Sequence, residues 1–264
     1  MNHLLATFAA FNAILFERRW TFLSIAGPTA IATLLLRQAQ YPVARIWLLD
    51  RRPYAFFLMT AITLLIAMLN SYAFAALAIV AQRRCTAVDA LREVLRKFTS
   101  ISALGLALTV IFFGSTICLL TPLAVVNAMH YFGATAVFLL STAQLLASGM
   151  TLPSMVFLVK EEIGVMEALA RGVKAGFRLV PMLLVLVFTF EWLPIGTRRE
   201  LLWWAQQTLS ASDGVSDLLS AFAWVSNAMI LVVQSAGLVA LVVAVLGIRS
   251  SSTEMASPLA GADA

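Results

Sequence analysis

The side chains that carry catalytic and metal chemistry are sparse and scattered in this sequence. Its only histidines are His3 and His130, which fall on opposite sides of the membrane in the topology derived below. Most acidic residues stand at the ends of apolar segments, and the sequence has no glycine-rich phosphate loop, zinc motif or Ser-His-Asp arrangement. We therefore expect no enzyme, no bound metal and no cofactor.

A second group of polar side chains interrupts long apolar segments at mid-length: Asn70, Gln144, Ser148 and Gln234. Such residues either hydrogen-bond between neighbouring membrane helices or line a cavity for a polar substrate, and both interpretations stay open. Glu191 is the single acidic residue within a predicted span. It lies three residues before Pro194, which suggests the outer interface, although a proton-coupling role is the alternative.

The elements that must position these residues are membrane helices. Lys97 and Lys160 enclose 62 residues without an Asp, Glu, Lys or Arg. About 20 apolar residues span a bilayer as a helix, so this stretch predicts two passes. The whole chain is 61% hydrophobic and 12% charged, about half the charged share of soluble domains. Cys85 and Cys118 are too few for a disulfide scaffold and are predicted to be free thiols.

The predicted fold is an all-α polytopic membrane bundle that forms one integral membrane domain over residues 1–248. The segment 3–17 is apolar but too short to span and has no signal cleavage site, which predicts a retained interfacial helix. Residues 249–264 are small and polar, which predicts a disordered cytoplasmic tail. The six predicted spans are 20–36, 54–81, 101–126, 132–159, 179–195 and 220–248.

Basic residues orient the bundle. With the N-terminus inside, cytoplasmic segments hold 12 of the 18 lysines and arginines, so both termini are predicted to be cytoplasmic. In a bacterium the protein would lie in the plasma (inner) membrane. The net charge of +5 comes from short clusters beside apolar spans, which favours a topological role over nucleic-acid binding.

Two basic amphipathic segments align when the chain is shifted by 78 residues, so that Val88–Leu91 falls on Met166–Leu169 and Arg96 on Lys174. Both segments are predicted to lie flat at the cytoplasmic surface, where arginines and lysines attract anionic lipid headgroups. Each is flanked by membrane helices, and the N-terminal helix with the first span forms a third, degenerate copy. The sequence therefore predicts parallel internal repeats of two spans each.

The same offset places Arg83 on Glu161 and Arg84 on Glu162. Both pairs follow a long even-numbered helix, so one hypothesis is an ion-pair clamp between the second and fourth spans. The alternative is that the arginines only anchor topology and the glutamates are solvated.

The loop between the last two spans has a capping-box pattern at Thr197 and Glu200, which predicts a short helix beginning there. This helix is expected to lie on the outer surface with Trp203 and Trp204 among the headgroups. It is interpreted as an interfacial anchor, with a substrate lid as the alternative.

At Leu152–Glu162, followed by Gly164–Gly176 (Gly-Val-Met-Glu-Ala-Leu-Ala-Arg-Gly-Val-Lys-Ala-Gly), the chain resembles a family of bacterial inner-membrane proteins. The family resembles the membrane domain fused to some glycerophosphodiester phosphodiesterases and includes stand-alone relatives of the YciC type. The resemblance implies an architecture and no activity, because catalysis in the fused proteins belongs to a separate soluble barrel, which we do not expect in this protein.

Two functions remain. The first is a non-catalytic membrane module that interacts with lipid or with membrane-protein partners, and the alternative is a small transporter or channel for a polar substrate. A cavity reached by Asn70, Gln144 and Gln234 would favour transport, and a tightly packed bundle would favour the module. The substrate, the oligomeric state and the partner proteins do not follow from the sequence.

Overall fold

The computed structural model describes residues 2–50, 52–125, 142, 146, 149–161, 163–209 and 215–255, and every element within these ranges is helical. The N-terminal part holds α1 (Asn2–Glu17), α2 (Arg19–Asp50), α3 (Pro53–Gln82), α4 (Ala87–Arg96) and α5 (Phe98–Val125). The C-terminal part holds α7 (Pro153–Lys160), α8 (Val165–Arg178), α9 (Val180–Val187), the π-helical turn η1 (Phe188–Trp192), α10 (Leu193–Leu209) and α11 (Val215–Met255).

Four helical segments of the described chain are long and apolar enough to cross a membrane: Arg19–Ile46, Pro53–Gln82, Val180–Ala205 and Leu219–Gly247. A fifth span results if α4 and the first part of α5 are taken together, although the two are bent by 85°. Helices of this length and apolarity indicate a membrane protein. The predicted span 132–159 lies mostly outside the described residues, and α7 covers only its end.

Several element ends differ from the sequence prediction. Helix α2 continues past residue 36 to Asp50 and contains both Pro28 and Pro42, so most of the predicted first outer loop is helical. Helix α11 extends to Met255, so the first part of the predicted disordered tail, residues 249–255, is helical as well. Residues 256–264 lie outside the described part.

The predicted separate helix beginning at Thr197 is wrong, because α9, η1 and α10 follow one another without a break. The Thr197 hydroxyl does not cap a helix start but donates a hydrogen bond to the Leu193 carbonyl at 2.8 Å. A threonine inside a helix commonly bonds to the carbonyl four residues earlier, and the capping-box pattern did not distinguish this case.

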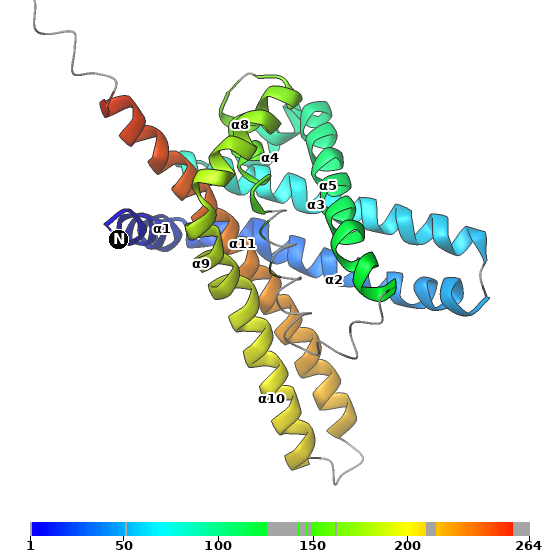
Figure 1. Ribbon diagram of the computed structural model, residues 1–264. Helices are drawn as coiled ribbons and strands as arrows, with labels where there is room; N and C mark the ends of the chain where they lie inside the picture. The colour runs from blue at the N-terminus through cyan, green and yellow to red at the C-terminus, as the bar shows by residue number, and fades with distance from the viewer. Residues whose placement is uncertain are drawn as a thin grey trace, which may run out of the picture.

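Buried side chains concentrate at one end of the bundle. We call this region the packed end and define it by Ala73–Ala81 of α3, Pro153–Val159 of α7 and Val239–Val245 of α11. The rest of α3, Tyr54–Asn70, with the facing part of α2 and the first half of α11, is called the open end. There, side chains as large as Phe57 and Leu65 are 70% and 52% exposed. In Figure 1 the α2–α3 hairpin and the α10–α11 hairpin diverge from the region of α1, α8 and α9.

Close contact between α7 and α8 belongs to the packed end. A Cβ atom on Gly172 would lie 2.5 Å from Cα of Ser154, and one on Gly176 would lie 2.6 Å from Cα of Met150. These two glycines are four residues apart on α8 and face the segment from Met150 to Ser154, at the start of α7. Small residues at this spacing let two helix backbones approach closely in a membrane.

Candidate functional site

Two cavities lie between the helices of the open end. The larger cavity, of about 650 Å³, lies among α2, α3, α5 and the start of α7. The smaller cavity, of about 360 Å³, lies among α2, α9, η1 and α11. Both volumes fall within the range of about 300–1,000 Å³ that is usual for small-molecule sites. Five residues line both cavities, namely Arg37, Asn70, Phe112, Leu152 and Leu238.

Asn70, the first of the predicted intramembrane polar residues, lies on α3 where the two cavities meet. The buried Thr33 of α2 donates a hydrogen bond from Oγ1 to Oδ1 of Asn70 at 3.5 Å. Asn70 is thus oriented from α2 while its amide stays accessible from the cavities. Both interpretations made from the sequence, an interhelical bond and a cavity lining, apply to this residue.

Gln234 and Glu191 meet across the smaller cavity. Gln234 of α11 donates a hydrogen bond from Nε2 to Oε2 of Glu191 at 2.6 Å. Glu191 lies in the π-helical turn η1, which adds a residue to the helical turn and occurs often at functional sites. The Glu191 carboxylate therefore faces α11. The other two predicted polar residues, Gln144 and Ser148, lie outside the described residues.

Sequence reasoning missed the positive charge of the site. Arg37 directly follows the predicted span 20–36, whereas the structure places it inside α2, lining both cavities. Gln40, one turn further, also lines the larger cavity and donates a hydrogen bond to Oγ1 of Thr63 at 2.7 Å. The signal was present in the sequence, since Arg37 and Gln40 are three residues apart directly after an apolar run and share one face if the helix continues.

Two further basic residues have partners that the sequence did not reveal. Lys97 donates hydrogen bonds from Nζ to the carbonyls of Leu158 at 3.4 Å and Val159 at 3.0 Å, near the end of α7. Arg18 donates in the same manner to the carbonyl of Val80, near the end of α3. The last carbonyls of a helix lack partners within the helix, so each cation satisfies such a group and interacts favourably with the helix dipole.

The predicted clamp between Arg83 or Arg84 and the glutamates that follow the fourth span is not among the ion pairs of the described residues. Arg83 pairs with Glu93 of α4, and Arg84 pairs with Glu17 of α1 at 2.8 Å. Glu161 pairs with Arg171 of α8 at 2.5 Å, and Glu162 lies outside the described residues. These three pairs connect the end of α3 or of α7 with α1, α4 or α8, and none of them joins α3 to α7.

Helix α4 exposes large apolar side chains. Thr86 begins the helix as its N-cap, accepting a hydrogen bond from the backbone N–H of Asp89 at 3.2 Å, and its hydroxyl donates to the Asp89 carboxylate. These bonds hold the pKa of Asp89 below its usual value. The small Ala90 and Val94 are buried against the bundle. The exposed apolar residues beside them are Val88, Leu91 and Leu95, at 64%, 41% and 63%, followed around the helix by Arg92 and Arg96.

Helix α8 repeats this arrangement. Its buried side consists of Ala168, Gly172 and Gly176. Met166 and Phe177 are 77% and 65% exposed, and the exposed Lys174 follows them around the helix. In both helices the apolar residues therefore divide into a buried set of mostly small residues and an exposed set of large ones.

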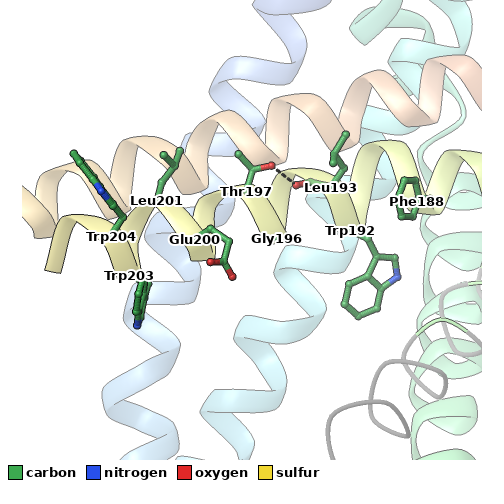
Figure 2. Close-up of a pocket in the computed structure, with 9 residues that line it drawn as sticks. All are labelled: Phe188, Trp192, Leu193, Gly196, Thr197, Glu200, Leu201, Trp203 and Trp204. Carbon is green, nitrogen blue, oxygen red and sulfur yellow. Dashed lines mark hydrogen bonds between the residues drawn. The ribbon is translucent and has the colours of Figure 1, made fainter. Parts of the chain in front are cut away.

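A surface hollow of about 790 Å³ follows one side of η1 and α10 (Figure 2). Gly196 leaves a gap between Trp192 and Glu200, and Trp203 lies beyond Glu200 on the same side of the helix. The lining comes entirely from one continuous helix, so this hollow has no opposing wall within the described residues. The tryptophans fit the predicted interfacial anchor in residue type, whereas their helix is continuous with the predicted fifth span.

Neither the composition of the cavities nor a comparison with known proteins identifies a reaction. Within the described residues, no three His, Cys, Asp or Glu side chains gather in a manner that could hold a metal ion. Comparisons of the chain with known protein families, with curated proteins and with solved structures found no match.

Proposed function

We propose that this protein is a non-catalytic integral membrane protein that binds anionic lipid headgroups at one membrane surface through α4 and α8. The observation that carries the proposal is the exposure of large apolar side chains beside basic ones on both helices, such as Leu95 beside Arg96 and Phe177 beside Lys174. Apolar residues at this position enter the acyl boundary, while arginine and lysine reach anionic headgroups.

The direction of α4 supports the same proposal. Helix α4 is bent by 85° from the first part of α5 at Lys97. If α5 crosses the bilayer, α4 lies nearly parallel to the membrane surface. Its exposed apolar side chains are then at the depth at which an interfacial helix binds.

The architecture that we propose consists of three parallel units, each with an interfacial helix, an odd span and an even span, and with both termini cytoplasmic. Support comes from Arg18 and Lys97, which each follow an amphipathic helix and each bond a carbonyl 62 residues later, at Val80 and Val159. Membership of the family that the sequence resembles is proposed on the motif Leu152–Glu162 and Gly164–Gly176 alone.

Lipid quenching tests the proposed function directly. Single cysteines replace Leu95 and Met166 in a chain that lacks Cys85 and Cys118, carry an environment-sensitive dye, and are placed in nanodiscs with brominated acyl chains. We expect strong quenching at both positions, and stronger quenching when phosphatidylglycerol replaces phosphatidylcholine. A matched cysteine at Asp89, on the charged side of α4, should be quenched weakly. Equal quenching at Leu95 and Asp89 would refute the proposal.

A small transporter for a polar substrate is the second candidate, and the cavities are the observation that favours it. Asn70 lines both cavities and Gln234 lines the smaller one. At the other end, Ala73–Ala81 of α3 are buried, and α3 contacts α7 and α11. Transport would require this end to separate, so crosslinking Leu77→Cys to a cysteine on α7 should abolish uptake by a transporter and leave lipid binding intact.

A further inference from the structure

We propose that the larger cavity binds an anionic amphiphile, a lipid-like molecule with a carboxylate or phosphate headgroup, and that Arg37 holds the headgroup. This site lies among the spans and is separate from the interfacial helices, so it does not depend on the function proposed above.

The position of Arg37 carries the first step of the argument. It lies within the candidate span Arg19–Ile46, on the wall that the two cavities share, and forms none of the ion pairs among the described residues. An arginine within a span is costly in lipid unless an anion or a polar cavity receives it. The planar guanidinium offers several N–H donors in a fixed arrangement that fits carboxylate and phosphate oxygens.

Neighbouring polar groups extend this headgroup site within the larger cavity. Gln40 donates a hydrogen bond to Thr63 at 2.7 Å. Asn70 lies about two turns after Thr63 on α3. Their amide and hydroxyl groups can donate to the remaining oxygens of an anion. Arg37 and Gln40 belong to α2, and Thr63 and Asn70 belong to α3. The hairpin of these two helices therefore provides all four headgroup contacts.

Charge distinguishes the larger cavity from the smaller one. Glu191 lines the smaller cavity, where it accepts a hydrogen bond from Gln234 and interacts electrostatically with Arg37. A second anion in that cavity would be repelled by this carboxylate. Among the described residues, no acidic side chain lines the larger cavity, so an anion bound there would not be repelled by a carboxylate of its lining.

Most of the remaining lining of the larger cavity is apolar, which is why the ligand is an amphiphile and not a small soluble anion. The hydroxyls of Ser71 and Thr109, which also line it, donate to backbone carbonyls four residues earlier. The apolar lining comes from α3, α5, α7 and α11, and includes Met59, Ile66, Phe74, Leu108, Met155 and Leu238. Of these, Phe74 and Met155 belong to the packed end and close the cavity there. An acyl chain fits such a lining, with its headgroup at Arg37 and its tail directed toward the packed end.

Equilibrium binding to the full chain in a neutral detergent tests the site with three probes: palmitate, lysophosphatidylglycerol and uncharged monopalmitoylglycerol. We expect both anionic probes, or one of them, to bind at least about tenfold more tightly than the uncharged probe, a difference of about 1.4 kcal/mol. The tighter anionic probe identifies the headgroup as carboxylate or phosphate.

Two variants locate the site. Arg37→Gln should lower the affinity for the anionic probe about tenfold, whereas Arg45→Gln, an exposed arginine of the same helix outside both cavities, should not. If Arg37→Gln does not fold, Ala67→Leu should block the same cavity while leaving Arg37 in place. Unchanged binding in both cavity variants, or equal affinity for charged and uncharged probes, would overturn the proposal.

Discussion

Helix α3 passes through both regions of the molecule and shows how differently they are built. From Ala73 to Ala81 every residue is buried, whereas Phe56, Phe57 and Leu58 near its start are all exposed. Both halves are strongly apolar, so hydropathy does not separate them. The difference lies in side-chain size: the buried half is rich in alanine, and small residues let neighbouring helices approach closely.

The consequence is a bundle that is tightly packed at one end and holds cavities at the other. Polar side chains follow this division. At the packed end, Arg18 and Lys97 are used to satisfy helix-terminal carbonyls. At the open end, Arg37 and Asn70 line the cavities and remain available to a ligand. We therefore assign stability to the first set and binding to the second.

Adding one methyl group at the packed end should produce the largest effect on stability. Gly172→Ala places Cβ on the backbone of Ser154, and we expect a loss of about 1–3 kcal/mol in the free energy of unfolding. Gly196→Ala is the matched control, because a Cβ there meets nothing within 4 Å and alanine favours the helix. Reversible unfolding in mixed micelles measures both. Equal effects would show that α7 and α8 are not in close contact.

Removing a charged cap at the packed end should have the next largest effect. Lys97→Met keeps the length of the side chain but leaves the carbonyls of Leu158 and Val159 without their donor, at a cost of about 1–2 kcal/mol. Lys160 is an exposed lysine at the end of α7. Lys160→Met serves as the control and should lower the free energy of unfolding only slightly. A result in which both lysines matter equally would argue against the cap.

At the open end, a similar loss of a hydrogen bond should matter less to stability. Gln234→Leu removes the donor to Glu191, and interhelical hydrogen bonds in membranes contribute about 0.6 kcal/mol on average. The exposed Gln38→Leu is the control. The same unfolding assay applies, and a loss larger than that of Lys97→Met would contradict the division between the two ends.

The smallest effect concerns α4 and depends on pH. Because the bonds with Thr86 lower the pKa of Asp89 in the folded state, its contribution is present above the ordinary aspartate pKa and is lost as the pH falls through the folded-state pKa. Thr86→Ala should cost about 0.5 kcal/mol at pH 7, the low end for the loss of a helix cap, and less in acid. Unfolding of wild type and variant at pH 7 and pH 3 checks this, and a constant difference would contradict it.

The sequence predicted well those helices whose first and last residues are determined by hydropathy alone. Helix α3 begins and ends one residue outside the predicted span 54–81. The errors arise where polar residues or prolines continue a helix, as at Pro42 in α2 and Pro194 in α10. A proline destabilises a membrane helix less than a helix in water, because neighbouring helices can satisfy the freed carbonyl groups.

The candidate site was predictable only in part. Asn70 and Gln234 were found because amides are conspicuous in apolar segments, and both line cavities. Arg37 was missed because it lines the cavities only if α2 continues past residue 36, where the predicted span ended. Similarly, the bonds of Arg18 and Lys97 join residues 62 apart, which no local pattern specifies.

A cysteine scan along α3 tests the division into two ends most directly. Single cysteines at Thr63, Asn70, Ala76 and Ala78 are introduced into a chain without Cys85 and Cys118, and their reaction with a small uncharged maleimide is followed in detergent. We predict reaction at Thr63 and Asn70, which line the larger cavity, and none at the fully buried Ala76 and Ala78 until the protein unfolds. Equal reactivity at all four positions would contradict a packed end and an open end.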